Sequence, residues 1–512
     1  MTAGWRFWID RGGTFTDVIG RAPGGGLHVR KVLSVQPERP GDPAVNAIAD
    51  LLGPEASVAP GSVVEEVRLG TTVATNALLE HHGAPVLLLI NRGLADLLEI
   101  GDQHRPDIFA LAIEKPRPLR VRVLEVDGRL DADGSELEPL RLDDALAAGL
   151  QAARADGYVS CAVALLHACR NPEHERRLAA WLEPFGFQRL ALSHQLSRQP
   201  RLVPRGHTTL VEAAVAPVLD TYLEQVRGAL GPGPRLRVMR SSGSLAAPQL
   251  LHAKDTILSG PAGGMVGAVA VAEQVLAAAG QAPGPVVGFD MGGTSTDVFH
   301  FDPALADLAW ERQPETEIAG LRLQAPMLPI HTVAAGGGSI VRFDGQRLLV
   351  GPESAGADPG PAAYRRGGPA TITDANLLLG RLPVAALPPV FGPAGDQSAD
   401  LEAARGRFAA LAAAIGGSPE RVAAGALAIA IETMAAAIRR ISIQRGHDLR
   451  GALLVSYGGA GGQHACRLAE VLGLGQVLLH PLAGVLSAYG IGRAEQRLLL
   501  ERSPRLPLSP ST

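Results

Sequence analysis

Two copies of one short pattern carry the residue types that bind phosphate and a divalent cation. The first is DRGGTFTD at residues 10–17 and the second is DMGGTSTD at residues 290–297, each directly after a short apolar run. Through the following valine, seven of nine positions are identical. Two carboxylates, adjacent glycines and two threonines predict a tight turn whose amides approach phosphate while an acidic group holds a metal. The repetition predicts two lobes that close on one nucleotide.

A third glycine-rich loop completes the candidate nucleotide contacts. Residues 458–462 (GGAGG) lie between an expected strand and an expected helix, where adenine and ribose can rest against bare backbone. One DxGG turn alone is as often a simple turn as a ligand site, but the duplication favours the ligand site. No lysine follows a glycine in the GxxxxGK[ST] arrangement, which excludes a Walker-type site.

The elements that must position these loops belong to a mixed α/β fold. Each signature falls in the first hairpin of a strand meander, and apolar runs typical of sheets covered on both faces lie between the copies. We expect a polar, irregular boundary at residues 193–205. The pattern predicts strands at 6–10, 14–19, 27–33, 86–90, 162–166, 285–290, 294–301, 453–456 and 477–480, and helices at 206–227, 420–445 and 463–472.

Composition excludes several classes of protein. The 512 residues carry a formal net charge of −4 with acids and bases interspersed, so we expect neither a nucleic-acid face nor a membrane anchor. No run of eighteen apolar residues and no signal peptide is apparent, which predicts a cytoplasmic protein. Three cysteines without a CxxC pair argue against a disulfide framework and a thiolate zinc site.

Ten segments between about residues 5 and 492 together resemble a known family. They are FWIDRGGTFTDV (7–18), LGTTVATNALLE (69–80), RPDIF (105–109), LSGPAGG (258–264), GFDMGGTSTDV (288–298), HTVAAGGGSI (331–340), VGPESAGADPGPAAYRRGGP (350–369), RGHD (445–448), GGAGGQHAC (458–466) and HPLAGVLSAYG (480–490). They resemble the actin, sugar-kinase and heat-shock ATPase superfamily and, more narrowly, the hydantoinase A and 5-oxoprolinase family. Arg11 and the RPDIF segment favour the 5-oxoprolinase branch.

The resemblance implies an α/β protein of two ribonuclease H-like ATPase lobes, of the actin and sugar-kinase type, with mixed sheets flanked by helices. We expect a first lobe at residues 1–200, a second at 201–495 and a tail at 496–512. Full hydantoinase A subunits carry a further C-terminal domain that this sequence does not match, and 5-oxoprolinases continue into a second large half.

The same resemblance assigns roles to the repeated residues. Mg²⁺ would be held mainly through water by Asp10 and Asp290, which together with Asp297 form the catalytic set. Asp17 and Asp297 have an alternative role, because an aspartate at a turn end often caps its own hairpin. The residues implied to bind ATP are Gly12, Gly13, Thr14, Thr16 and Asp17 in the first phosphate loop, Gly292, Gly293, Thr294 and Thr296 in the second, and Gly458, Gly459, Ala460, Gly461 and Gly462 in the adenosine loop.

The implied reaction is ATP-dependent opening of a cyclic amide such as 5-oxoproline or a hydantoin. Phosphorylation of the carbonyl oxygen would overcome amide resonance, and water could then open the ring. We expect a hydantoinase B-type partner subunit and a homo- or hetero-oligomer. Two alternatives remain open: an acetone carboxylase-like component, and a nucleotide-switched actin-like binding protein.

Other polar segments have two interpretations each. Residues 259–264 precede an apolar helical run, so their amides form a candidate anion site, although a tight loop also explains the glycines. The 336–339 loop is expected to approach closely between the lobes, and His331 and His464 are typical core histidines. Nothing in the spacing of Asp358, Asp374 and His331 requires a metal site. Four polar residues at 71–76 are either helix caps or, by resemblance, part of the substrate cleft: Thr71, Thr72, Thr75 and Asn76. Residues 241–244 (SSGS) replace the family's usual Ser-Asn-Gly-Gly.

Overall fold

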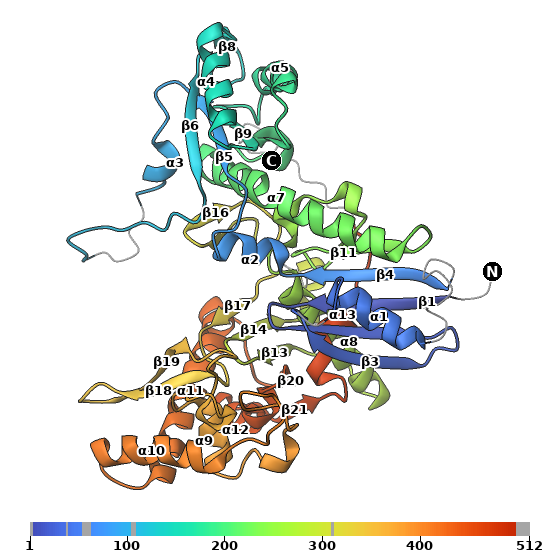
Figure 1. Cartoon of the computed structure of the whole chain (residues 1–512), viewed down its shortest axis with the longest axis vertical. Coiled ribbons are helices and arrows are strands. Elements are labelled where there is room, and N and C mark those ends of the chain that lie inside the picture. The colour runs from blue at the N-terminus through green and yellow to red at the C-terminus, as the bar shows by residue number, and fades with distance from the viewer. Residues whose placement is uncertain (1–3, 37–38, 54–62, 104–108, 309–311, 498–512) are drawn as a thin grey trace, which may run out of the picture. The chain divides into compact units, whose positions relative to one another are not determined.

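The chain folds into two compact units (Figure 1). The computed structural model describes residues 4–36, 39–53, 63–103, 109–308 and 312–497. Unit 1 comprises Met1–Ala262, Arg312–Leu328 and Ala494–Thr512, and unit 2 comprises Gly263–Glu311 and Pro329–Arg493. Most of the RPDIF segment lies outside the described residues.

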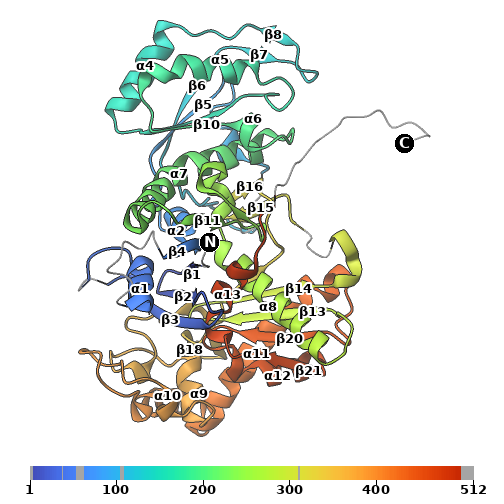
Figure 2. The same ribbon diagram turned by 90° about the vertical axis from the view of Figure 1, so that its right-hand side faces the viewer.

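Unit 1 contains two sheets that share the helix α7 (Leu202–Leu230) as a common core element. The buried cluster includes Phe7 and Val67 from one sheet, Leu88 from the other, and Leu210 from α7. Figures 1 and 2 show α7 between these sheets. The first sheet has the order β12 (Leu245–Ala246), β11 (Arg235–Met239), β4 (Val64–Thr71), β1 (Trp5–Arg11), β2 (Phe15–Arg21), β3 (Leu27–Leu33), and the second has the order β10 (Arg189–Leu192), β9 (Ser160–Ala164), β5 (Val86–Asn91), β6 (Val121–Val126).

Helices cover these sheets, and a short strand pair from the 312–328 segment packs against α7. The helices are α1 (Pro43–Leu52), α2 (Val73–Leu79), α3 (Leu97–Ile100), α4 (Asp144–Ala155), α5 (Glu173–Leu182) and α6 (Ser193–Leu196). The small strands are β7 (Arg129–Leu130), β8 (Glu136–Glu138), β15 (Thr316–Ile318) and β16 (Leu321–Leu323).

Unit 2 repeats the strand plan of unit 1. Its sheet has the order β17 (His331–Val333), β14 (Thr296–Phe301), β13 (Val286–Met291), β20 (Leu453–Tyr457), β21 (Gln476–Leu479). In both units a hairpin is followed on one side by an antiparallel strand and on the other by parallel strands. The duplication is therefore one of topology as well as of sequence, and the predicted α/β class with mixed sheets is confirmed.

Helices flank the unit 2 sheet on both faces. Figure 2 shows α11 and α12 on one side of it, with α8 and α13 on the other. The remaining elements are α8 (Ser259–Ala278), β18 (Ser339–Phe343), β19 (Leu348–Ser354), α9 (Ile372–Leu378), α10 (Leu401–Ile415), α11 (Pro419–Ile441), α12 (Ala465–Leu472) and α13 (Leu486–Arg493). The first four residues of α8, residues 259–262, belong to unit 1 and the rest of α8 to unit 2.

Glycines let α8 and α13 cross at very short range within unit 2. A Cβ atom added to Gly490 would overlap the carbonyl oxygen of Gly263, and one added to Gly267 would lie 2.6 Å from the carbonyl oxygen of Leu486. No other residue fits such a crossing, because every other side chain begins with a Cβ atom. α8 and α11 are also long and apolar enough to cross a membrane, but 61% and 56% of their most apolar windows are buried in the fold, as core helices are.

Most predicted elements are confirmed to within a few residues, and two expectations were wrong. α7 begins at Leu202, inside the segment expected to be an irregular boundary, and Arg205 in that segment is fully buried. Residues 259–264, expected to precede a helix, form its first turns. Both errors arise because polar residues and glycines that face a packed interior look like loop residues in the sequence.

Candidate functional site

The first signature is a tight hairpin that displays backbone amides at its tip. Gly12 donates its N–H to the carbonyl oxygen of Phe15 at 3.0 Å, which leaves Gly13 and Thr14 as the turn. The second signature repeats this bond between Gly292 and Ser295 at 3.0 Å. Both tips therefore have the same shape.

Several tip glycines are not explained by the fold. Gly13, Gly292 and Gly293 do not have positive φ angles. A Cβ atom on Gly293 would meet no described atom within 4 Å, and one on Gly13 or Gly292 would make only an ordinary contact, at 3.5 Å and 3.8 Å. A bare backbone at such positions is suited to close approach by a ligand.

Asp10 and Asp17 stand side by side on one face of the first hairpin, because they are direct partners in the β1–β2 register. Burial, and then the charge of Asp17, raises the pKa of Asp10 to about 7. Asp10 Oδ1 is buried and has no hydrogen-bond partner among the described residues. Lys31 donates to Asp17 Oδ1 at 2.6 Å, so Asp17 has a local ion pair, whereas the described residues show none for Asp10.

Two further segments of unit 1 converge on Asp10. Thr72, at the β4–α2 junction, donates its N–H and its hydroxyl to the carbonyl oxygen of Arg11, at 3.0 and 3.2 Å. At the start of α8, a Cβ atom on Gly260 would lie 3.2 Å from Asp10 Oδ1. The sequence predicted these segments as separate motifs, and the fold brings both to the first hairpin.

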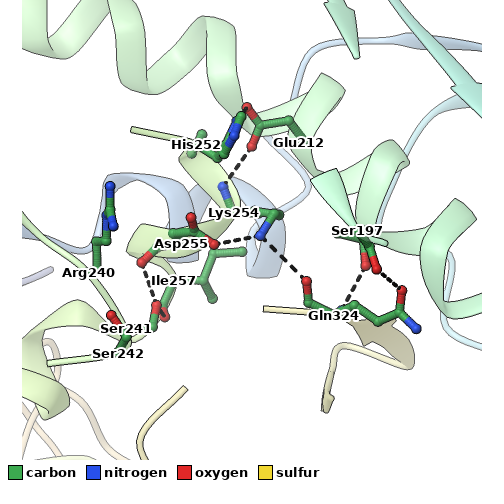
Figure 3. Close-up of polar contacts among 12 residues, drawn as sticks. Ser197, Glu212, Arg240, Ser241, Ser242, His252, Lys254, Asp255, Ile257 and Gln324 are labelled. Carbon is green, nitrogen blue, oxygen red and sulfur yellow. Dashed lines mark hydrogen bonds and ion pairs between the residues drawn. The ribbon is translucent and has the colours of Figure 1, made fainter. Parts of the chain in front are cut away.

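The turn that leads into α8 is fixed by buried polar bonds (Figure 3). The Ser241 hydroxyl donates to the main-chain oxygens of Asp255 and Ile257, the first at 2.7 Å. Lys254, which is almost fully buried, donates from Nζ to Asp255 Oδ1 at 2.6 Å. Ser241, the first residue of the 241–244 segment and the serine that the family pattern also has, thus holds the backbone. Lys254 was not among the site residues predicted from the sequence. The one sign that could have marked it is that lysine is rare among the 47 basic residues.

In unit 2, Asp290 and Asp297 are partners in the β13–β14 register, as Asp10 and Asp17 are in unit 1. Burial raises the pKa of Asp297 to about 6, although Thr332 donates to its Oδ1 at 2.5 Å. Tyr457 pairs with Asp290 across β13 and β20, and burial together with both carboxylates raises the pKa of its phenol well above the ordinary value. No residue pattern in the sequence pointed to this tyrosine.

The fold of unit 2 brings the 458–462 loop to the second hairpin. Ala460 donates its N–H to the carbonyl oxygen of Met291 at 2.9 Å. Gly458 has φ +80°, and a Cβ atom there would collide with Asp290 Oδ1. By contrast, a Cβ atom on Gly459 would meet nothing within 4 Å among the described residues, and one on Gly462 only an ordinary contact at 3.8 Å. Gly461 is required by packing, since its Cβ would lie 2.8 Å from Ser456 Oγ.

The 336–339 loop makes a close approach to the second hairpin of its own unit, and its expected place between the lobes stays a prediction. Gly337 and Gly338 donate to the carbonyl oxygens of Gly292 and Gly293, at 3.1 and 2.6 Å. These bonds brace the tip from behind, and a Cβ atom on Gly336 would lie 2.6 Å from Gly293 O.

The threonines at the end of each signature support the hairpins from within the core. Thr16 is buried and shares a hydrogen bond of 2.9 Å with Ser34, which in turn donates to Gly12 O at 2.7 Å. Thr296 is also buried and donates to Ala335 O. Thr14 and Thr294 lie at the tips, where their side chains are at least partly accessible. The structure thus places Thr16 and Thr296 in positioning roles.

Other candidate residues are occupied by structural contacts. Asp374 accepts four hydrogen bonds, from the N–H groups of Ala362, Ala363 and Thr371 and from the Thr371 hydroxyl. His464 is buried beside Asn376, and burial lowers its pKa to about 4. Among the described residues, no group of three or more His, Cys, Asp or Glu side chains is arranged to hold a metal.

The aspartate environments fit a hard, hydrated cation better than a fully coordinated one. Mg²⁺ takes oxygen ligands and keeps several waters, so one carboxylate from the protein is often enough. Asp10 offers a buried carboxylate oxygen without a partner in the described chain, and Asp290 lies beside a glycine that leaves room for its carboxylate. Both residues therefore suit a water-mediated Mg²⁺ contact.

Family models and individual relatives match the chain to the same protein family. The family model described as hydantoinase/oxoprolinase matches residues 205–499, and the one described as hydantoinase/oxoprolinase N-terminal region matches residues 6–185. The chain is 41% identical to 5-oxoprolinase 1 of Arabidopsis thaliana over 532 residues, covering 96% of this chain and 41% of that protein. It thus spans about two fifths of that relative's length.

A bacterial relative of known structure matches over more of its own length. The caprolactamase subunit alpha of Pseudomonas jessenii is 34% identical, with 95% of this chain and 70% of that protein covered. The crystal structure of the ATP-dependent caprolactamase from the same organism superposes with a TM-score of 0.78. A nucleotide-free acetone carboxylase structure superposes with a TM-score of 0.75 at 24% identity, which shows a shared fold.

Proposed function

The chain belongs to the hydantoinase/oxoprolinase family, and from this premise we propose that it is the ATP-binding component of an enzyme that opens cyclic amides. The relatives are named as 5-oxoprolinases and as a subunit of an ATP-dependent caprolactamase. Their common chemistry is hydrolysis of a ring amide at the expense of ATP.

The observation that carries the proposal is the pair of hairpin tips with glycines that the fold does not require. Each of Gly13, Gly292 and Gly293 loses more conformational entropy on folding than a larger residue would. The fold has room for a Cβ atom at all three positions, so packing does not explain why they are glycines. Amides exposed over bare backbone are the usual cradle for phosphate oxygens. We therefore assign the tip amides of residues 12–14 and 292–294 to the phosphates, and the 458–462 loop to adenosine.

ATP would supply a phosphoryl group to the carbonyl oxygen of the ring amide, which makes the carbonyl carbon open to attack by water. The hairpin amides would stabilise the negative charge that spreads over the transferred group. Asp10 and Asp290 would hold Mg²⁺ largely through water. Asp17 and Asp297, each paired in register with one of these carboxylates, would keep the local charge high enough to retain the cation.

Ring opening itself is proposed to need a second polypeptide. The Pseudomonas jessenii relative is named a subunit alpha, and this chain spans 70% of it. We propose a hydantoinase B-type partner that receives the activated amide, so the isolated chain is expected to bind ATP and to turn it over slowly.

The test is ADP release by the chain with 5-oxoproline, caprolactam and hydantoin, each with and without a B-type partner. Turnover stimulated by one of these rings, together with the opened product, would support the proposal. A requirement for bicarbonate and a carboxylated product would replace it with the carboxylase alternative. ATP turnover that responds to a protein partner but to no small molecule would favour a nucleotide-switched binding protein.

The prediction that both hairpins serve one nucleotide has its own test. Equilibrium dialysis should give one ATP per chain, and an alanine substitution at Asp10 or at Asp290 should weaken that single binding event. Two independent binding events, each sensitive to only one substitution, would contradict it.

A further inference from the structure

We propose that the first turn of α8 is a phosphoryl-binding subsite, in which the main-chain N–H groups of Ser259 and Gly260 bind the terminal phosphate of ATP beside Asp10. This inference rests on the proposed function and deepens it, since neither signature includes α8. The two hairpin tips are the other proposed contacts to the phosphates. The start of α8 would be a third contact, made to the phosphoryl group that is transferred.

The helix start offers donors without acceptors. α8 runs for 20 residues from Ser259, and at its start Ala262 donates its N–H to Leu258 O at 3.3 Å. Pro261 has no N–H group to donate. The N–H groups of Ser259 and Gly260 have no acceptor in the described part of the chain. The positive end of a helix dipole with free amides favours a negatively charged group.

Asp10 provides the second, independent sign of a ligand at this helix start. Its Oδ1 is buried without a partner, and all three atoms nearest to a Cβ built on Gly260 belong to Asp10, at 3.2, 3.5 and 3.7 Å. The carboxylate is thus directed at the helix start without a hydrogen bond to it. A buried, unsatisfied carboxylate oxygen costs free energy unless a ligand or cation completes its shell.

The charge of Asp10 narrows the choice of ligand. A free anion between a carboxylate and two amides would be repelled by the carboxylate, whereas an anion that arrives with a divalent cation satisfies both sides. A phosphate oxygen can accept from the amides while the cation lies toward Asp10. The chemistry fits a magnesium-bound phosphoryl group, either the terminal phosphate of ATP or free phosphate.

The 71–76 segment ties this helix start to the tip of the first hairpin. Ser259 Oγ donates to Thr71 O at 3.1 Å, and Leu258 donates its N–H to Thr75 Oγ1 at 3.1 Å. A Cβ atom on Gly13, at the hairpin tip, would lie 3.5 Å from Asn76 Nδ2. The α8 amides and the tip amides therefore flank the same short segment and can contact one phosphate chain.

The backbone that aims α8 is strained and is held by polar bonds. Leu258 has φ +65°, a left-handed conformation that is strained for a residue with a Cβ atom. The Thr75 hydroxyl binds its N–H, and Ser241 binds the preceding carbonyl oxygen of Ile257 (Figure 3). A strained residue of this kind is retained where it sets the direction of the next element, which here is α8.

The experiment compares ATP, ADP and inorganic phosphate binding to the full chain with Mg²⁺ present, by isothermal titration calorimetry. Ser259→Pro removes one amide at a helix position that proline favours, and Ser259→Ala removes only the hydroxyl. Gly260→Ala keeps the amide but places a methyl group in the subsite. Glu402→Pro, at the second residue of α10, removes an exposed N-terminal amide elsewhere and serves as the matched control.

The expected result is a loss of ATP affinity of about tenfold or more in Ser259→Pro and Gly260→Ala, with ADP affinity within about twofold of wild type. Glu402→Pro should bind both nucleotides as the wild type does, and Ser259→Ala, which keeps the amide, should lose less ATP affinity than Ser259→Pro. Loss of phosphate binding in the same two variants would show that free product uses this subsite too, whereas unchanged phosphate binding would limit it to bound ATP.

Equal losses for ATP and ADP, or no loss in Gly260→Ala, would overturn the inference. If Ser259→Pro does not fold, Gly260→Ala decides alone, because the three described atoms nearest to its methyl group all belong to the Asp10 side chain. If the wild type binds neither nucleotide, the proposed function fails. The subsite then stands only if inorganic phosphate with Mg²⁺ binds the wild type and not Gly260→Ala.

Discussion

Replacing Asp10 with asparagine should make unit 1 more stable than the wild type, by an amount that grows as the pH rises. Burial raises the pKa of Asp10 from 3.8 to about 7, so the folded protein holds this proton more tightly than the unfolded chain does. Stability is therefore lost as the pH rises from about 4 to about 7, where the unfolded chain has released the proton and the folded chain has not. Asparagine has no proton to release and escapes this loss.

The magnitude follows from the size of the shift. About three pH units at about 1.4 kcal/mol each give about 4 kcal/mol as the full cost of the charged carboxylate at high pH. The free amides at the start of α8 stabilise the charged Asp10 carboxylate by about 1 kcal/mol, which reduces this cost. We expect the advantage of Asp10→Asn to grow by about 2–3 kcal/mol between about pH 5 and pH 8.

The assay is urea unfolding in a chelating buffer without nucleotide, followed by tryptophan fluorescence at several pH values. Trp5, Trp8 and Trp181 all belong to unit 1, so the signal reports mainly on that unit. Asp96→Asn, at an exposed aspartate of unit 1, is the control and should show no trend with pH. A difference between Asp10→Asn and wild type that stays flat across the series would refute the burial argument.

Two further predictions concern unit 2. Gly490→Ala should lower its unfolding temperature by several degrees, a cost of about 3 kcal/mol or more, because the new Cβ atom overlaps Gly263 O. Gly406→Ala, at a helical glycine of α10 with no described atom within 4 Å of its Cβ position, should instead stabilise by about 0.5–1 kcal/mol, and calorimetry that ranks the two alike would contradict the packing argument. Asp290→Ala should lower ATP turnover about 100-fold or more while the melting temperature stays near that of the wild type, and wild-type turnover would remove Asp290 from the site.

Local patterns accounted for most of the elements. The alternation at residues 14–19 and the helical spacing across 420–445 predicted β2 and α11 to within a few residues, because each pattern depends on neighbours in sequence. The start of α7 was missed because Arg205, fully buried, has all the marks of a surface residue. Its guanidinium donates to Leu165 O at 2.7 Å, 40 positions away in the chain, and to Ser193 Oγ at 3.0 Å, and residue type and local spacing reveal neither contact.

The sequence by itself determined the two signatures, their repetition and the glycine loop, because phosphate-binding turns are built from consecutive residues. The tertiary structure decided which of these glycines the fold requires and which it leaves bare. It also brought Gly260 to Asp10 across about 250 positions of the chain and buried the Asp10 carboxylate enough to raise its pKa. Burial and close approach depend on how distant segments pack, and residue spacing carries no record of that packing.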